Sequence, residues 1–131
     1  MALGGSTNTV LHLPAIAHEG GLKLTYDDFI AINARAPYLC SLQPAGEYTM
    51  EDLEFAGGVP LVLARIKSLL RDNPTVAGKS LFDLLPEDKA VDPALVRDID
   101  NPIEPEGGIA ILFGNLAPDG AVVKTAALSS T

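Results

Sequence analysis

The chain has 131 residues, of which 47% are apolar, and its formal net charge is −8, with nine Lys and Arg against seventeen Asp and Glu. This length suits one compact core rather than two large ones, and the scattered basic residues argue against a nucleic-acid surface. No apolar run approaches the roughly 20 residues of a membrane helix, and residues 1–5 lack the basic flank of a signal peptide, so we expect no membrane partner and a cytoplasmic location.

Two helices are expected in the first third of the chain. The first lies within residues 6–19, because the Ser, Thr and Asn side chains at its start can cap free backbone amides. Pro14 removes a backbone donor inside this helix and predicts a kink or a break there. The second helix begins at Thr25, where Asp28 completes an approximate capping box, and it stops at Pro37.

The middle of the chain carries the clearest helical pattern. Before it, the apolar run Tyr38–Leu42 fits a buried strand and an extended linker equally well. A capping pair, Thr49 with Asp52, then opens a short helix. A longer helix follows Gly57–Gly58, and its apolar residues share one stripe that we expect to be buried, namely Val59, Val62, Leu63, Ile66, Leu69 and Leu70.

The pattern changes in the last third of the chain. A short helix at residues 80–85 leads into a proline-rich, acid-rich connection over residues 86–106. Gly108–Phe113 and Gly120–Leu128 are short runs of the residue types typical of strands. The turn between them, residues 114–120, is longer than a tight hairpin needs. Helices followed by strands indicate that two architectures meet within this chain.

The segment Gly4-Gly5-Ser6-Thr7-Asn8 is the candidate site with the clearest chemistry. Free amides and the helix dipole converge at the start of a helix, so an anion can bind there. The further glycines and the lysine of phosphate-binding and dinucleotide-binding fingerprints are missing. The spacing therefore leaves two interpretations open, helix capping, which it favours, and contact with a ligand.

The other reactive residues favour structural roles. His12 and His18 are six residues apart, which places them on different faces of a helix and argues against a metal-binding pair. The acidic residues at 51–54 suit the dipole of a helix start. Cys40 has no recognisable histidine partner and is expected to be buried and apolar, while Lys124 is expected to face solvent from the last strand. A single cysteine also excludes an internal disulfide and an iron–sulfur site built only from cysteines of this chain.

Blocks spread over nearly the whole chain resemble, in the same order, the dihydroxy-acid and sugar-acid dehydratases. These blocks are Ala2–Thr9, Leu11–Leu13, Ala15–Glu19, Pro44–Gly46, Met50–Leu53, Ala56–Pro60, Thr75–Leu81, Asp100–Ile103, Gly107–Leu112 and Gly114–Lys124. The Met50–Leu53 block and the closing segment are more similar to the dihydroxy-acid branch of the family than to the phosphogluconate branch.

The resemblance implies a hydro-lyase with an iron–sulfur cluster and Mg²⁺ that converts a 2,3-dihydroxy acid into a 2-keto acid in valine, leucine and isoleucine biosynthesis. In that family the cluster cysteines and a Cys-Asp-Lys metal motif precede the matching region, and a serine-bearing Thr-Asp-Gly-Arg motif follows it. Neither motif occurs in this chain. We therefore expect an internal fragment that holds no catalytic residue, binds no cluster and no metal, and is inactive alone.

The resemblance also implies how the fragment is organised. We expect an α/β fragment in which residues 1–85 are the helical portion of an N-terminal α/β domain and residues 86–106 are a connection. Residues 107–131 then begin a C-terminal β-barrel-like domain. Ser6 and Thr7 are the expected substrate contacts in the complete enzyme, which we expect to be a homo-oligomer. Apolar faces left uncovered in the fragment favour self-association.

Two alternative functions stay open. One is a fragment of a sugar-acid (aldonate) dehydratase, because the residues that contact the substrate tail lie largely outside this chain. The other is a non-catalytic binding module that retained part of the dehydratase fold. Assays of the complete enzyme on both substrates separate the two dehydratases, and continuation of the reading frame into the missing motifs separates a fragment from a module.

Overall fold

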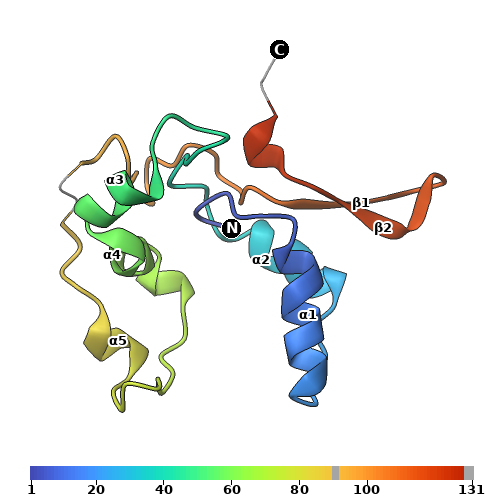
Figure 1. Cartoon of the computed structure of the whole chain (residues 1–131), viewed down its shortest axis with the longest axis horizontal. Coiled ribbons are helices and arrows are strands. Elements are labelled where there is room, and N and C mark those ends of the chain that lie inside the picture. The colour runs from blue at the N-terminus through green and yellow to red at the C-terminus, as the bar shows by residue number, and fades with distance from the viewer. Residues whose placement is uncertain (90–91, 129–131) are drawn as a thin grey trace.

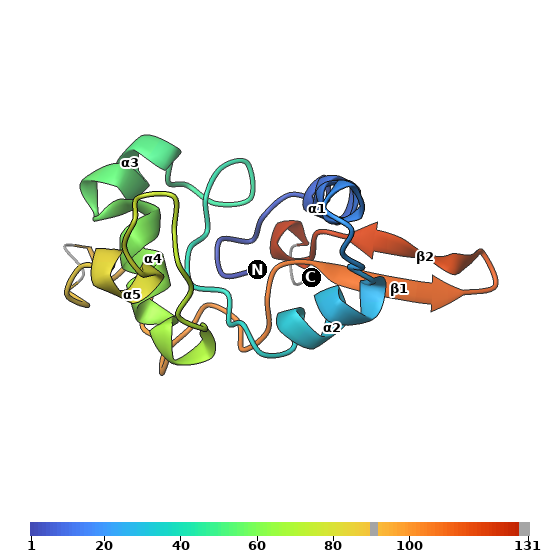
Figure 2. The same cartoon turned by 90° about the horizontal axis from the view of Figure 1, so that it is seen from below.

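The computed structural model describes residues 1–89 and 92–128. The elements are, in chain order, α1 Thr9–Glu19, α2 Tyr26–Asn33, α3 Met50–Phe55, α4 Gly58–Arg65, the 3-10 turn η1 Lys67–Leu69, α5 Leu81–Leu84, β1 Ala110–Gly114, β2 Ala117–Val123 and the 3-10 turn η2 Thr125–Ala127. They form two lobes, one of α3, α4 and α5 and the other of α1, α2 and the β1–β2 hairpin, with the N-terminus between them (Figure 1). Figure 2 shows the same separation from below.

The two helices predicted in the first third of the chain are confirmed. α1 follows Asn8 and runs through Pro14 as a single helix, so the proline does not break it. The capping box of α2 is formed, because the backbone N–H of Thr25 donates to Asp28 Oδ2 at 2.8 Å. α2 ends at Asn33, ahead of the proline that was expected to stop it.

Of the two predicted interpretations, the structure supports the extended linker: the run Tyr38–Leu42 forms no strand of the hairpin sheet. Its strand-like pairings are isolated bridges, including one between Tyr38 and Glu104, and it also forms backbone hydrogen bonds with Ala2 and Arg97. Leu39 and Cys40 are completely buried in it. The apolar run thus serves as a buried connection through the middle of the molecule.

Helix α4 differs from its predicted pattern. The α-helix ends at Arg65, earlier than expected, and η1 follows. Val59, assigned to the buried stripe, is 41% exposed, whereas Leu61, which lies outside that stripe, is 2% exposed. The prediction for Val59 was wrong, because the face of α4 that enters the core carries Leu61 and Val62, which share one cluster with Leu95 and Val96 from a distant segment.

A pair of carboxylates holds that distant segment against α4. Arg65 Nε lies 2.9 Å from Asp88 Oδ1, and Arg65 Nη1 donates to Asp98 Oδ2 at 2.9 Å. The arginine side chain is only 9% exposed, whereas both carboxylates remain about half exposed. One largely buried guanidinium therefore faces a carboxylate on each of two sides, hydrogen-bonded to Asp98 and ion-paired with Asp88, and both reduce the cost of its desolvation.

The hairpin confirms two strands but corrects their limits. β1 and β2 are antiparallel, with Ala110 opposite Val123 and Gly114 opposite Ala117. The long turn predicted over residues 114–120 is wrong, because most of it belongs to β2 and only two residues connect the strands. Lys124 follows the end of β2 and is half-buried, so its prediction as a solvent-facing strand residue was also wrong.

The described residues combine helices with one open, two-stranded antiparallel sheet, which is consistent with a fragment of an α/β protein. The barrel-like domain stays a prediction for a longer protein. The larger core cluster lies in the lobe of α3 and α4, and a smaller one joins Val10, Phe29 and Ile109 from α1, α2 and the approach to β1. Across residues 1–89 and 92–128, every helix is too short or too polar to cross a bilayer.

Candidate functional site

The loop before α1 is a tight turn that requires glycine. The backbone N–H of Gly4 donates to the carbonyl of Met1 at 3.0 Å. Gly4 and Gly5 have φ angles of 71° and 53°, in the left-handed region that favours glycine. A Cβ at Gly4 would also lie 2.9 Å from Tyr38 Cε2. Conformation and space together restrict this position to glycine.

The approach to β1 crosses this loop at close range. A Cβ on Gly108 would lie 2.5 Å from the Cα of Gly4 and 2.8 Å from the Cβ of Ala126. The backbone N–H of Gly108 also donates a long hydrogen bond to the carbonyl of Met1, with 3.4 Å between nitrogen and oxygen. The loop is therefore held between Tyr38 on one side and the segment that leads into β1 on the other.

Ser6 and Thr7 are both exposed at the mouth of α1, but their hydroxyls are not equivalent. Ser6 Oγ accepts a hydrogen bond from the backbone N–H of Asn8 at 3.2 Å. Within the described part of the chain, the Thr7 hydroxyl has no hydrogen-bond partner, and neither have the backbone amides of Ser6 and Thr7. Ser6 thus makes a local hydrogen bond within the loop, whereas Thr7 and the two amides are available to an anion.

Asn33 is a feature of this region that sequence reasoning missed. It is buried, and its Oδ1 accepts a hydrogen bond from the backbone N–H of Ile109 at 3.2 Å, while its carbonyl accepts one from Gly107 at 2.9 Å. Next to it lies an open pocket of about 300 Å³, lined in part by Tyr38 and Thr125. The sequence did contain a signal, because Asn33 lies four residues after Phe29 and so on the same face of the helix. A polar side chain buried on such a face needs a hydrogen-bond partner.

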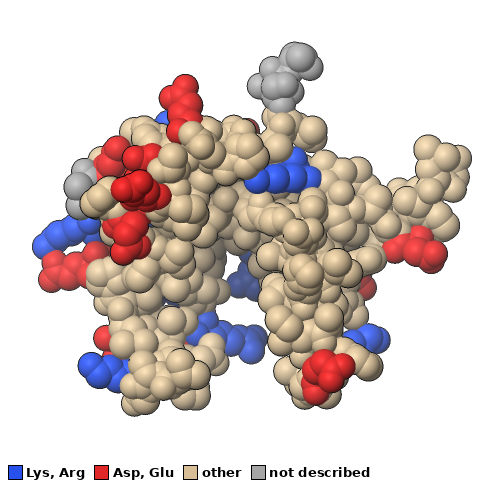
Figure 3. Space-filling view, viewed as in Figure 1, with Lys and Arg blue, Asp and Glu red and all other residues tan. Residues whose placement is uncertain are grey.

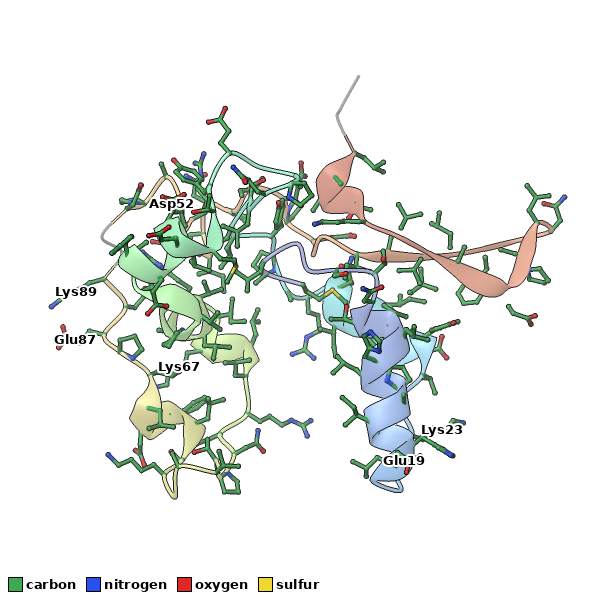
Figure 4. All side chains as sticks on the ribbon, viewed as in Figure 1. Glu19, Lys23, Asp52, Lys67, Glu87 and Lys89 are labelled. Atoms are coloured by element: carbon green, nitrogen blue, oxygen red, sulfur yellow. The ribbon has the colours of Figure 1, made fainter. Side chains whose placement is uncertain are left out.

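The other candidates from the sequence lie apart from the loop or from one another. His12 and His18 are exposed along α1, and in residues 1–89 and 92–128 no three His, Cys, Asp or Glu side chains gather into a metal-binding group. Asp52 lies on α3, in the other lobe (Figure 4). Its pKa is lowered by hydrogen bonds from the backbone N–H and the hydroxyl of Thr49, which confirms its capping role.

Cys40 is a buried apolar residue, as predicted. Burial raises the pKa of its thiol from 9.0 to about 11, so at neutral pH it is protonated. A protonated, inaccessible thiol is a poor nucleophile and a poor metal ligand.

We expect Cys40 to resist a thiol-specific reagent at pH 8 in the folded chain and to react rapidly once urea unfolds it. The unfolded thiol ionises near 9.0 and the folded one near 11, so this group lowers stability as pH rises through that interval. The measurement is the labelling rate with and without urea, with urea midpoints compared at pH 8 and 10. Rapid labelling without urea, in protein whose circular dichroism is native, contradicts the burial of Cys40.

Comparisons with known proteins agree with this organisation. The sequence model of the family "Dihydroxy-acid/6-phosphogluconate dehydratase N-terminal" matches residues 1–84, and the corresponding C-terminal model matches residues 94–131. The loop before α1 lies in the first match, and Gly108, which crosses it, lies in the second.

Three relatives are each named dihydroxy-acid dehydratase. The chain is 53% identical to the protein of Geobacter sulfurreducens over 98% of its length, 50% identical to that of Thermodesulfovibrio yellowstonii over 99%, and 51% identical to that of Sulfolobus acidocaldarius over 100%. It spans only 23% or 24% of the length of these relatives. The two family matches, which together account for nearly all of the sequence, show that this chain belongs to the dihydroxy-acid/6-phosphogluconate dehydratase family.

Proposed function

We propose that the complete protein containing this chain is a hydro-lyase that removes water from a 2,3-dihydroxy carboxylic acid and yields a 2-keto acid in valine, leucine and isoleucine biosynthesis. The observation that carries the proposal is an identity of about one half, over nearly the whole chain, to relatives named dihydroxy-acid dehydratase. The family name also includes 6-phosphogluconate dehydratases, so a sugar acid is the competing substrate.

Within that enzyme, we assign the loop of Ser6 and Thr7 to the carboxylate of the substrate. The support is local: the amides of both residues and the Thr7 hydroxyl are donors without a partner in the described part of the chain. They directly precede the positive end of an 11-residue helix. Because the Ser6 hydroxyl already accepts from Asn8, Thr7 is the stronger candidate for side-chain contact.

The iron–sulfur cluster and Mg²⁺ belong to this proposal for the complete protein only. Cys40 is the single cysteine of the chain, and it is completely buried with its pKa raised. The described residues also do not gather three metal-ligating side chains in one place. These residues do not suit either group, so we assign both cofactors to other segments of the polypeptide and expect the chain alone to be inactive.

The test is Thr7→Ala and Ser6→Ala in the complete enzyme, with Tm, kcat and KM measured on 2,3-dihydroxyisovalerate. We expect Thr7→Ala to lower kcat/KM by about tenfold or more, since each lost ~1.4 kcal/mol of transition-state stabilisation costs a factor of ten. We expect Ser6→Ala chiefly to lower stability, by about 1 kcal/mol, because it removes the hydrogen bond that Ser6 accepts from Asn8.

The matched control is Thr49→Ala, which removes a formed cap on α3, where Thr49 Oγ1 accepts from Asp52 N at 3.1 Å. This variant should lose stability with unchanged kcat/KM. If Thr7→Ala also leaves kcat/KM unchanged, the assignment of the loop to the substrate is wrong. Higher kcat/KM on an aldonate than on 2,3-dihydroxyisovalerate contradicts the substrate class instead.

A further inference from the structure

Helix α1 exposes large apolar side chains around most of its circumference. With the histidines neutral, Glu19 is the one charged side chain between Met1 and Leu22. Val10 is the buried residue of α1, whereas Leu11, Leu13 and Ile16 are 66%, 45% and 67% exposed. In the space-filling view the α1 arm is mostly uncharged down to its tip (Figure 3), and the side-chain view labels Glu19 and Lys23 at that tip (Figure 4).

A helix that is apolar on most sides is typical of protein interiors. Helices at a protein surface show a broad polar face, whereas α1 has only a narrow one, formed by His12 and Glu19. A shallow groove of about 400 Å³ continues the apolar surface from α1 to the start of α2, with Leu11, Pro14 and Leu24 among its lining residues. A contiguous exposed apolar surface of this kind is typical of a surface that packs against another protein segment or molecule.

The positions of the exposed side chains indicate what kind of cover is needed. At 3.6 residues per turn, Leu11 and Leu13 lie about 160° apart around the axis of α1. A second copy of the chain, bound across a twofold axis, covers one patch and leaves the opposite side of the helix in water. Enclosing both sides requires several elements, as in the core of a domain.

We propose that α1 is a core helix of the complete dehydratase, enclosed by segments of the same polypeptide outside residues 1–131. The length of those segments is the second support, because the chain spans only 23% or 24% of its relatives. The inference rests on family membership and not on the proposed activity or on the role of Thr7. The mouth of α1 then opens inside the protein rather than at its surface.

The decisive variant is Ile16→Asp in the complete protein. A carboxylate enclosed by apolar segments without a partner is strongly destabilising, so we expect Tm to fall by more than about 10 °C or the protein to be insoluble. Ile16→Leu, which conserves volume and apolar character, is the matched control and should leave Tm nearly unchanged. If Ile16→Asp yields no soluble protein, Ile16→Ala supplies a measurable decrease in Tm.

In the 131-residue chain, Ile16→Asp is expected to affect self-association. There the side chain is 67% exposed, so Ile16→Asp should reduce self-association in analytical ultracentrifugation. An unchanged Tm of the complete protein with Ile16→Asp overturns the proposal. If that result accompanies a concentration-dependent dimer of the 131-residue chain that Ile16→Asp abolishes, the cover is a second copy. These readouts use stability and mass, so an inactive complete enzyme contradicts the proposed function without affecting this inference.

Discussion

Replacing Gly108 with alanine is expected to destabilise the chain by about 3 kcal/mol, the upper part of the range for overpacking. The added Cβ would lie 2.5 Å from the Cα of Gly4, a backbone atom that no side-chain rotation can move away, and 2.8 Å from the Cβ of Ala126. The loop of residues 4–7 must shift to accommodate it. The measurement is the urea midpoint and slope of unfolding.

Gly114→Ala is the matched control for this substitution. Gly114 lies at the far end of β1, and a Cβ there meets no atom within 4 Å. Its free energy of unfolding, from the urea midpoint and slope, should stay within about 0.5 kcal/mol of that of the parent chain, as is usual for open surface positions. Equal midpoints for the two alanine variants contradict the close crossing of Gly108 and Gly4.

The close crossing has a consequence for the proposed site. Gly4 belongs to the part of the chain that the N-terminal family model matches, and Gly108 belongs to the part that the C-terminal model matches. The hydrogen bond from Ile109 to Asn33 joins the same two parts. The loop that presents Thr7 is thus held by both matched parts, which makes its geometry sensitive to how they pack together.

The features that were predictable from the sequence depend on neighbouring residues. The capping boxes of Thr25 with Asp28 and of Thr49 with Asp52 involve residues three apart, so their geometry follows from helix formation itself. Ser80 caps α5 in the same local way, accepting from Asp83 N at 3.2 Å.

The features that escaped prediction depend on residues far apart in the chain. The hydrogen bond between Asn33 and Ile109 spans 76 positions, and the one between Arg65 and Asp98 spans 33. Helical periodicity indicates one apolar face of α4, but it carries no information that Leu95 and Val96 return to pack against this helix. Likewise, the need for glycine at 108 arises from the close approach of Gly4, not from its own neighbours.

Truncation of Leu53 to alanine is expected to cost about 3 kcal/mol, within the range measured for buried leucines. Its side chain, from α3, is completely buried in the larger core cluster with Leu39 and Leu61. Removing it leaves a cavity that the surrounding helices fill only in part, so dispersion contacts are lost together with hydrophobic burial.

Leu116→Ala is the control for Leu53→Ala, since it removes the same atoms from a side chain that is 96% exposed in the connection of the hairpin. It should change the free energy of unfolding by less than about 0.5 kcal/mol. Urea unfolding followed by circular dichroism measures both variants in the 131-residue chain. A loss for Leu53→Ala no larger than that for Leu116→Ala means that the α3–α4 core is not formed in solution. In that case the buried connection Tyr38–Leu42, and the support that Tyr38 gives to Gly4, are lost with it.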